Sequence, residues 1–439
     1  MAEEVWMLQT KKADFKQIGA RFRIDPVTAR IIRNRGIEGE AAIDRYLNGT
    51  LDDLYDPMLL KDMERAVSIL CEAVDTGKKI RIVGDYDIDG VCSTYILLQA
   101  FERLGSDVDF EIPDRIKDGY GINESIIEQA HADGVEVILT CDNGISAFHQ
   151  VELAKKYGMT VVITDHHEVP LDGEKEKIPP ADAVIDPKQA DCPYPFPEIC
   201  GAVVAYKLVQ VLYARRGVPQ MEWLDLLEFA AIATVGDVMK LQDENRILVK
   251  YGLKKMAQTK NLGLRRLAEK NNLDLGAITA YHIGFVIGPC LNAGGRLKTA
   301  KEALALLRAQ SEEEAERLAE ELKELNDTRK DMTEQGTEAA KLQVESWYQK
   351  DKVLVVFLPE CHESLAGIIA GRLREYYQKP AIVLTRGEEA VKGSGRSIDE
   401  YHMFKKLTEV SDLLLKFGGH PLAAGLSLEE KNIDEFRRR

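Results

Sequence analysis

Short apolar runs that end in acidic residues recur in the first half of this 439-residue chain. KKIRIVGDYDIDG (78–90) and VEVILTCDNGIS (135–146) are each followed by an amphipathic stretch, and MTVVITDHHEVP (159–170) adds a third run. Nearly continuous apolar runs that alternate with amphipathic helices are typical of a parallel sheet with helices on both faces. We therefore predict a doubly wound α/β domain, whose ligands bind at the carboxyl ends of the strands.

Potential metal ligands follow directly after each predicted strand. The first run ends in Asp85, Asp87 and Asp89, which repel one another unless water, backbone amides or a cation offsets their charge. The other two strand ends carry Asp142, Asp165, His166, His167 and Glu168. A set rich in Asp with a few His suits Mn²⁺ or Mg²⁺ better than zinc. Two such ions about 3.5 to 4 Å apart can bracket a phosphate, and they need at least one bridging carboxylate.

Each motif also has an ordinary structural interpretation. Asp87 and Asp89 could belong to a turn that only caps the next helix, and DNG (142–144) is by itself a turn signal. A His pair is often part of a solvated loop, and Asp237, after the apolar stretch FAAIATVG, could simply end a helix. The common position of the first three motifs at one sheet edge favours a metal site, which then needs Asp237 as a further ligand.

A long helix is predicted in the second half of the chain. Its apolar residues are spaced three, four and three apart, at Ala315, Leu318, Leu322 and Leu325. It either bridges two domains or lies on the surface of one, and DKVLVVFLPE (351–360) then starts a new α/β unit. We therefore predict an N-terminal segment (1–55), a catalytic domain (56–310), a connecting helix (311–349) and a smaller α/β domain (350–439).

Charge and cysteine content restrict the class of protein. The formal net charge of −15, taken alone, counts against a nucleic-acid partner, but bound divalent cations and a local basic groove can reverse the sign where it matters. The seven cysteines are scattered without a CxxC pair, which disfavours a disulfide scaffold and a zinc knuckle. No export signal or membrane-spanning run is found. We expect a soluble cytoplasmic protein with no membrane partner.

The four acidic motifs, in this order, resemble those of the DHH phosphoesterase superfamily. The intervening text is similar to the bacterial single-strand-specific exonucleases of that superfamily, in DRIKDGYGIN (114–123), YPFPEICGAVVAYKL (194–208), IGPCLNAGGRL (287–297) and FGGHPLAAGLSL (417–428). The resemblance covers most of the chain from about Lys78 to Leu428. It implies that the catalytic domain is a DHH domain and that the smaller domain is a DHH-associated, substrate-binding domain.

The resemblance also implies a role for each ligand. Asp87 and Asp89 would bind separate ions, Asp142 would bridge them and take part in catalysis, and His166 with Asp237 would complete the second ion.

Two further positions of the metal site follow from the same resemblance. His167 would lie close behind the ligands as a catalytic, phosphate-facing group. Many relatives begin the first motif with a His at the position of Val83, and this departure is the pattern of the exonuclease branch. Asp85 or water would then complete the first ion.

Phosphodiester hydrolysis also needs positive groups on the nonbridging oxygens. GSGRS (393–397) offers backbone amides, hydroxyls and a guanidinium to an anion, although a single arginine is more often an ordinary surface residue. By the resemblance, the residues that hold a terminal 5′ phosphate would be Arg115, Arg296, Ser394 and Arg396. Gly419 and His420 would lie near the scissile group, with His420 as a catalytic residue. Candidates for stacking on bases are Tyr120, Tyr194, Phe196 and Tyr281, although most aromatic residues should belong to the core.

The favoured hypothesis is an exonuclease that hydrolyses single-stranded DNA from 5′ to 3′ into 5′-mononucleotides with two Mn²⁺ or Mg²⁺ ions, in repair and recombination. Single-strand-binding protein and a helicase are candidate partners. One alternative is a phosphodiesterase for short oligoribonucleotides or cyclic dinucleotides. Another is a non-catalytic replication or repair scaffold, which is disfavoured because the predicted ligands are all present. Relatives usually continue into an OB-fold, whereas this sequence stops at NIDEFRRR (432–439), so weaker binding of long strands is expected.

Overall fold

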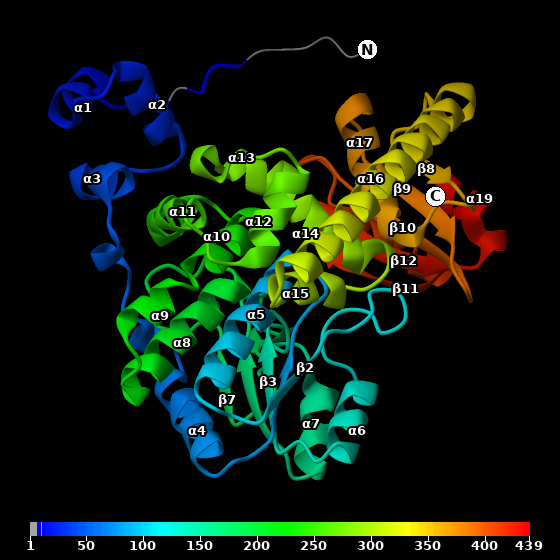
Figure 1. Ribbon diagram of the computed structural model, residues 1–439. Coiled ribbons are helices and arrows are strands. Elements are labelled where there is room, and N and C mark those ends of the chain that lie inside the picture. Colours follow the sequence, from blue (N-terminus) through cyan, green and yellow to red (C-terminus); the bar gives the residue numbers. More distant parts are fainter. Residues whose placement is uncertain (1–6, 10) are drawn as a thin grey trace. The chain divides into compact units, whose positions relative to one another are not determined.

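A parallel five-stranded sheet forms the centre of the larger of two units in this computed structural model, which describes residues 7–9 and 11–439. The larger unit is Leu8–Lys323, and the smaller contains Glu324–Arg439. The strands of the first sheet are β1 (Ile80–Val83), β2 (Val108–Glu111), β3 (Val137–Cys141), β4 (Thr160–Thr164) and β7 (Ala183–Ile185) (Figure 1). Their order is β2-β1-β3-β4-β7, and all neighbours are parallel, which confirms the predicted fold class.

The strand order reverses beside β1. The helix α5 (Ile88–Arg103) leads from β1 to β2, and α6 (Glu124–Ala132) leads from β2 back to β3 on the other side of β1. Right-handed crossovers in opposite directions place these helices on opposite faces of the sheet. The gap between the carboxyl ends of β1 and β3 is therefore the switch point at which ligands bind in such sheets.

Edge strand β2 is absent from the sequence prediction. Its residues VDFE alternate in polarity and are only half-buried, whereas β1 and β3 are buried throughout. A short alternating run at an edge carries a weaker signal than a central strand that is buried on both faces. Without β2, the order of the sheet and its switch point could not be derived.

Helices complete the larger unit. The first group comprises α1 (Phe15–Phe22), α2 (Pro26–Asn34), α3 (Glu40–Asn48), α4 (Met63–Asp75), α7 (Phe148–Lys156), α8 (Gly201–Arg216) and α9 (Gln220–Leu224). The second comprises α10 (Leu227–Gly236), α11 (Asp243–Met256), α12 (Leu262–Lys270), α13 (Ala280–His282), α14 (Gly288–Leu297) and α15 (Lys301–Leu307). A π-helical turn (Ile283–Ile287) joins α13 to α14 without a break. The short strands β5 (Leu171–Asp172) and β6 (Lys175–Glu176) form a separate hairpin.

A buried ion pair connects the N-terminal segment to this helical layer. Lys207 of α8 lies 3.0 Å from Glu244 of α11, and both side chains are almost fully buried. Lys207 also donates to the backbone oxygen of Tyr55 (3.1 Å), and the Tyr194 hydroxyl donates to Glu244. Tyr194 is therefore one of the aromatic residues of the core and is excluded as a candidate for stacking on bases.

The smaller unit contains a mixed five-stranded sheet. Its strands are β8 (Leu354–Phe357), β9 (Ala381–Arg386), β10 (Val391–Arg396), β11 (Leu414–His420) and β12 (Ala423–Leu428), in the order β11-β12-β10-β9-β8. Only β8 and β9 pair in parallel. The helices are α17 (Glu363–Tyr377), α18 (Met403–Glu409) and α19 (Ile433–Arg438). The predicted long helix is α16 (Glu312–Gln343), whose first residues belong to the larger unit and whose remainder, from Glu324, belongs to the smaller one. A π-helical turn (Val344–Tyr348) continues it.

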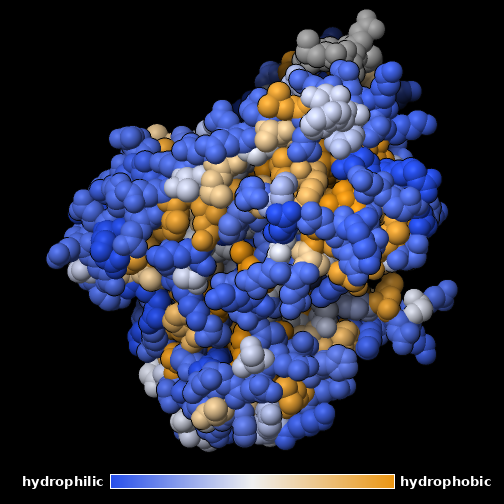
Figure 2. Space-filling model, turned by 90° about the vertical axis from the view of Figure 1, so that its right-hand side faces the viewer, coloured by the Kyte–Doolittle hydropathy of each residue, from blue (hydrophilic) through white to orange (hydrophobic). Residues whose placement is uncertain are grey.

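Charged and polar residues dominate the surface, as expected for a chain with 30% charged residues. Hydrophobic residues occur in scattered patches on the face that Figure 2 shows. None of the helices in the described residues has the length and apolar character needed to span a membrane.

Candidate metal centre

The first acidic motif forms the loop between β1 and α5. Asp87 is the N-cap of α5, and its Oδ1 accepts hydrogen bonds from the N–H groups of Asp89 (2.9 Å) and Gly90 (3.2 Å). The interpretation as a helix cap is therefore correct. Both bonds use one oxygen, however, so capping leaves the other carboxylate oxygen available for a cation.

The N-terminus of α8 positions Asp89. Both carboxylate oxygens of Asp89 accept hydrogen bonds at 2.7 Å, one from the N–H of Gly201 and one from the N–H of Ala202. Free N–H groups and the dipole at a helix N-terminus favour a negative charge, so α8 orients this carboxylate without a basic side chain. Gly201 also touches the next motif, because a Cβ atom on it would lie 2.7 Å from the Cβ of Asp142.

Replacing Gly201 by alanine should loosen the metal centre without unfolding the chain. The added methyl group must displace Asp142 or α8, so we expect a 10- to 100-fold loss in Mn²⁺ affinity and in rate, about the effect of removing a group that orients a ligand. Titration of activity with Mn²⁺ measures it. Gly371→Ala is the matched control, since its Cβ would have no neighbour closer than 4.0 Å. Equal Mn²⁺ requirements in the two variants would contradict this expectation.

Asp142 follows β3 in a left-handed backbone conformation, with φ of 62°. Aspartate and asparagine adopt this conformation more readily than most residues. Its side chain is buried, and its Oδ1 accepts no hydrogen bond from any described residue. The Tyr120 hydroxyl donates to its backbone oxygen at 2.8 Å. A buried carboxylate oxygen that accepts no hydrogen bond is typical of a position that a cation completes.

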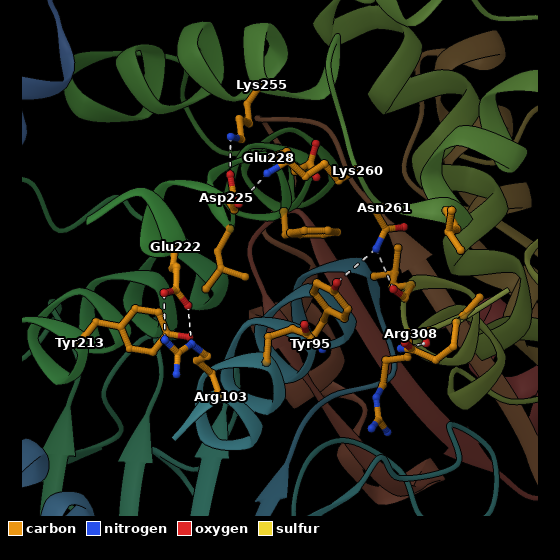
Figure 3. Close-up of a pocket in the computed structure, with 17 residues that line it drawn as sticks. Tyr95, Arg103, Tyr213, Glu222, Asp225, Glu228, Lys255, Lys260, Asn261 and Arg308 are labelled. Carbon is orange, nitrogen blue, oxygen red and sulfur yellow. Dashed lines mark hydrogen bonds and ion pairs between the residues drawn. The ribbon is translucent and has the colours of Figure 1, made fainter. Parts of the chain in front are cut away.

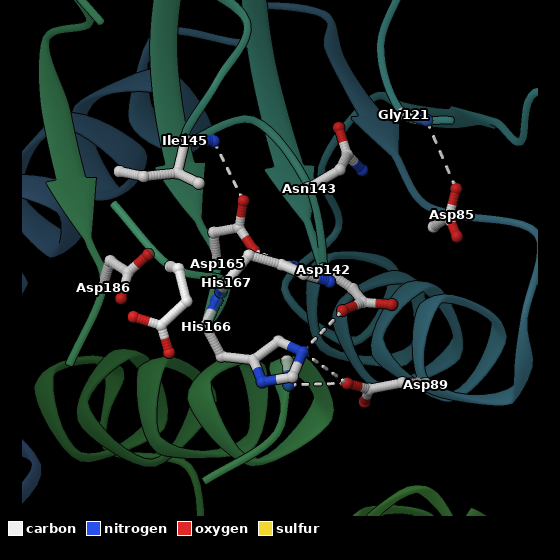
Figure 4. Close-up of polar contacts among 12 residues, drawn as sticks. Asp85, Asp89, Gly121, Asp142, Asn143, Ile145, Asp165, His166, His167 and Asp186 are labelled. Atoms are coloured by element: carbon white, nitrogen blue, oxygen red, sulfur yellow. Dashed lines mark hydrogen bonds and ion pairs between the residues drawn. The ribbon is translucent and has the colours of Figure 1, made fainter. Parts of the chain in front are cut away.

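Seven predicted residues converge at the switch point, and Figure 4 labels Asp85, Asp89, Asp142, His166 and His167 among them. Ligand atoms within 4.8 Å of one another form three groups, which are Asp85-Asp87-Asp142, Asp89-His166-Asp237 and Asp142-His166-His167. His166 Nε2 lies 3.1 Å from Asp142 Oδ1, 3.4 Å from Asp89 Oδ2 and 3.8 Å from Asp237 Oδ2. Asp142 thus belongs to the group that contains Asp85 and also lies beside His166 of the other group. This is the position that a bridging ligand requires.

Burial and the charges of neighbouring carboxylates oppose ionisation of two acids in this centre. Burial, reinforced by Asp87, raises the pKa of Asp85 to about 8, and burial with the charge of Asp89 raises the pKa of Asp237 to about 8. Burial lowers the pKa of His166, so its imidazole does not supply a positive charge to these acids. Asp237 also ends α10, where the helix dipole disfavours an anion. These oxygen and imidazole donors fit Mn²⁺ or Mg²⁺.

Asp165 holds the histidine pair in place, a role that the sequence did not reveal. Its Oδ1 accepts from the N–H of His166 (2.7 Å) and lies 2.7 Å from His167 Nδ1, and its Oδ2 accepts from the N–H of Ile145 (2.9 Å). Burial opposes ionisation, but the bond to His167 holds the pKa of Asp165 below its usual value. The only sequence signal is an acid directly before two histidines, which does not distinguish a ligand from a supporting residue.

Two predicted phosphate-binding residues lie beside the first motif. The guanidinium of Arg115 stacks over the Tyr86 ring at 3.8 Å, and its Nε donates to the backbone oxygen of Gly295 at 3.2 Å. Arg296 is the next residue after Gly295, so it is adjacent in the chain to a residue that Arg115 contacts. Both arginines lie in the same unit as the acidic cluster, as an anion site next to it requires.

The other predicted substrate residues belong to the smaller unit. Arg396 Nη1 donates to Ser394 Oγ at 3.1 Å on β10, and a Cβ atom on Gly367 of α17 would lie 2.8 Å from Arg396 Nη2. Gly419 has φ of 147° near the end of β11, next to the exposed His420. Arg396 and Ser394 thus lie together, whereas their action at the metal centre stays a prediction.

A separate cavity of about 400 Å³ lies along α5, beside α10 and α12 (Figure 3). Its charged rim is paired, with Arg103 bonded to Glu222 and Lys255 to Asp225. Glu228 is buried in its lining, where Oε1 accepts from Thr259 Oγ1 at 2.7 Å and Oε2 has no donor among the described residues. None of the predicted site residues lines this cavity.

Glu228→Gln is expected to stabilise the protein at high pH. Burial raises the pKa of Glu228 from an ordinary value of 4.5 to about 7, so between these pH values the folded chain keeps a proton that the unfolded chain has lost. Ionisation therefore destabilises the fold as pH rises, fully so above about pH 7. The variant should be more stable by about 1–3 kcal/mol at pH 8 and nearly unchanged at pH 5. Urea unfolding at both values measures this, and a pH-independent difference would contradict it.

Comparison with known proteins agrees with the fold and the acidic cluster. The family model described as "DHH family, N-terminal domain" matches residues 79–234, and the DHHA1 domain model matches residues 350–439. The class of protein is thus a DHH-family protein with a metal centre at its switch point. Among curated proteins, the single-stranded-DNA-specific exonuclease RecJ of Escherichia coli is 36% identical over 437 residues, which are 95% of this chain and 74% of that protein. This chain belongs to the RecJ family.

Other relatives agree. RecJ of Bacillus subtilis is 37% identical over 437 residues, and the match covers 99% of this chain but 54% of that protein. This chain therefore spans about half the length of the Bacillus relative and about three quarters of the Escherichia one. The crystal structure of RecJ from Thermus thermophilus in complex with Mn²⁺ has a TM-score of 0.82 and 31% identity, over 97% of this chain and 59% of that one.

Proposed function

We propose that this protein is an exonuclease that hydrolyses single-stranded DNA from the 5′ end into 5′-mononucleotides, with two Mn²⁺ or Mg²⁺ ions. The observation that carries the proposal is the position of Asp142, whose carboxylate belongs to one group of ligand atoms and lies 3.1 Å from His166 of the other. The names of the relatives, single-stranded-DNA-specific exonucleases, support the choice of substrate. Repair and recombination, in the cytoplasm and beside single-strand-binding protein and a helicase, is the predicted setting.

The residues divide the chemical work between them. Bound divalent ions would activate a water molecule and stabilise the charge that develops on the phosphate oxygens. On this proposal, Asp85, Asp87 and Asp142 hold one ion, and Asp89, Asp142, His166 and Asp237 hold the other. Asp165 fixes the ring of His167. Burial alone would lower the pKa of His167, but the bond to this carboxylate outweighs burial and raises that pKa to about 9. A protonated His167 can donate a hydrogen bond to a phosphate oxygen.

On this proposal, two arginines beside the metal centre bind the terminal 5′ phosphate and so select the 5′ end of the strand. Arg115 and Arg296 lie beside the first acidic motif and offer guanidinium groups to a terminal phosphate. Arg396, Ser394, Gly419 and His420 are proposed to act on the same substrate from the DHHA1 domain. A terminal phosphate held at a fixed distance from the metals places the first phosphodiester bond for cleavage.

Substrate length and end chemistry test this proposal. A 5′-phosphorylated 20-nucleotide strand, the same strand with a 5′ hydroxyl, the blunt duplex and a dinucleotide are each incubated with Mn²⁺ or with EDTA. We expect 5′-mononucleotides from the phosphorylated strand, slow attack on the duplex and no product with EDTA. A higher kcat/KM on the dinucleotide than on the 20-nucleotide strand would favour a short-oligonucleotide phosphodiesterase instead.

Arg115→Gln should remove most of the preference for a 5′ phosphate. A charge-assisted hydrogen bond to phosphate contributes about 1.5–3 kcal/mol, so the rate ratio between phosphorylated and hydroxyl-ended strands should fall by about 10- to 100-fold. Arg103→Gln is the matched control, because Arg103 is paired with Glu222 at the separate cavity. An unchanged ratio in Arg115→Gln would remove this residue from the proposed phosphate site.

A further inference from the structure

One continuous helical segment (280–297) runs alongside the acidic motif. It consists of α13, the π-helical turn and α14. A Cβ atom on Gly288 would lie 3.3 Å from Cδ1 of Ile88, the residue between two predicted ligands, and one on Gly295 would lie 2.3 Å from the backbone oxygen of Tyr86. The segment therefore packs against the first motif at two points, with glycine at each of them.

The segment presents two stacked aromatic side chains to solvent at its N-terminal end. Tyr281 is 64% exposed and Phe285 is 67% exposed, and their ring centroids lie 4.8 Å apart with 27° between the planes. Ile283 and Ile287, on the same turns, are fully buried and anchor this end in the core. The aromatic pair is thus not needed for packing, although exposing two large apolar rings side by side is unfavourable in water.

The π-helical turn packs against α10, the helix that ends at the predicted ligand Asp237. A Cβ atom on Gly284 would lie 3.7 Å from Cγ1 of Val235 in α10, and α10 ends at Asp237. Val238, directly after that predicted ligand, is 86% exposed and has φ of 58°, which a β-branched residue rarely adopts. Strained backbone and π-helical turns both concentrate at functional sites.

The helix fixes the spacing along the substrate. Phe285 and Tyr281 precede Gly288 by three and seven residues, about 4 to 10 Å along the axis, and Arg296 lies about 12 Å beyond Gly288 in the other direction. A nucleic-acid strand advances about 3.4 Å or more per nucleotide. A strand with its 5′ phosphate near Arg296 and its scissile bond at the metals would therefore bring its next two or three bases to the aromatic pair.

We propose that Tyr281 and Phe285 form a stacking platform for the second to fourth bases of the strand, which are the first to third on the 3′ side of the scissile phosphate. The proposal rests on the proposed exonuclease function and deepens it, because it assigns a residue pair that distinguishes longer strands from dinucleotides. Aromatic faces accept any base, so the platform contributes affinity without sequence preference. Its occupant is a single-stranded nucleic acid, whose bases are apolar on their faces and match two exposed rings.

A ladder of 5′-phosphorylated oligothymidylates of 2, 3, 4, 6 and 20 nucleotides tests the platform. The variants are Tyr281→Ala, Phe285→Ala, both together, and Tyr281→Phe, which keeps the ring. We expect the double variant to raise KM about 10- to 100-fold for six and 20 nucleotides, with kcat and the dinucleotide rate unchanged. Tyr281→Phe should behave as the parent protein. Tyr157→Ala is the control, since this exposed tyrosine lies just before the amino end of β4, whereas the metal centre is at the carboxyl ends of the strands.

The outcomes separate the two proposals. If the double variant loses activity equally on all lengths, or loses the Mn²⁺-dependent rise in melting temperature, the aromatic pair supports the metal centre and the platform is refuted. If KM is unchanged at every length, the pair does not contact DNA, and a protein interface becomes its explanation. If the parent protein hydrolyses no single-stranded DNA in Mn²⁺, the exonuclease proposal itself fails.

Discussion

Asp142→Asn is expected to lower the rate of hydrolysis by at least about 10³-fold while the chain stays folded. Loss of a ligand shared by two ions removes several kcal/mol of charge stabilisation in the transition state, and each 1.36 kcal/mol is tenfold in rate. Asparagine keeps the size of the side chain and tolerates the φ of 62° at this position, which alanine tolerates less well. The rate is measured on a 5′-phosphorylated single strand at saturating Mn²⁺.

A second measurement separates loss of metal from loss of fold. Mn²⁺ should raise the melting temperature of the parent protein, because a ligand that binds only the folded state stabilises it. The variant should keep the melting temperature of the metal-free parent, or exceed it, since a buried charge has been removed, and should respond weakly to Mn²⁺. Asp186→Asn is the matched control, because Asp186 is also buried after a strand of the same sheet, β7, but lies outside the three ligand groups.

Two results would count against this assignment. Near-parent rates in Asp142→Asn would exclude a bridging role. A full Mn²⁺ response of the melting temperature in that variant would show that the ions bind elsewhere. If Asp186→Asn lost as much activity as Asp142→Asn, the effect would belong to any acid removed from this sheet edge.

The sequence predicted the metal centre better than it predicted what supports the centre. The carboxyl ends of parallel strands lie at one edge of a sheet, so three apolar runs were enough to predict that Asp87, Asp142 and His166 lie close together. Asp165 has the same residue type and the same position after a strand. Its separate role depends on hydrogen bonds to His166 and His167, which spacing does not reveal.

Long-range contacts explain what else was missed. The sequence around Gly201 predicts only an ordinary first residue of a helix. The packing of α8 shows in addition that a side chain there would clash with Asp142. Tyr194 sits between prolines and reads as an exposed loop residue, yet Glu244, which it contacts, is 50 residues away in the chain. Position on a strand or helix follows from local pattern, whereas partners across the fold do not.

Lys207→Met should cost about 3–5 kcal/mol of stability. Lys207 and Glu244 are almost fully buried, 3.0 Å apart, and removal of the lysine leaves Glu244 as an uncompensated charge in the core. Burial lowers the pKa of Lys207 although Glu244 opposes the shift, which shows how far this amine is removed from water. Chemical denaturation at neutral pH measures the loss.

A double variant distinguishes an unpaired charge from lost packing. Glu244→Gln added to Lys207→Met removes the second charge and keeps an acceptor for the Tyr194 hydroxyl, so most of the stability should return. Lys155→Met is the surface control, since its partner Asp182 is partly exposed, and it should cost no more than about 1 kcal/mol.

The ion pair of Lys207 and Glu244 also bears on catalysis, because α8 carries Lys207 and, one and a half turns earlier, the amides that hold Asp89. Lys207→Met should therefore need more Mn²⁺ for half-maximal rate, and the double variant should need less than the single one. A stability loss below about 1 kcal/mol in Lys207→Met, or no recovery in the double variant, would show that packing and not charge holds these helices together.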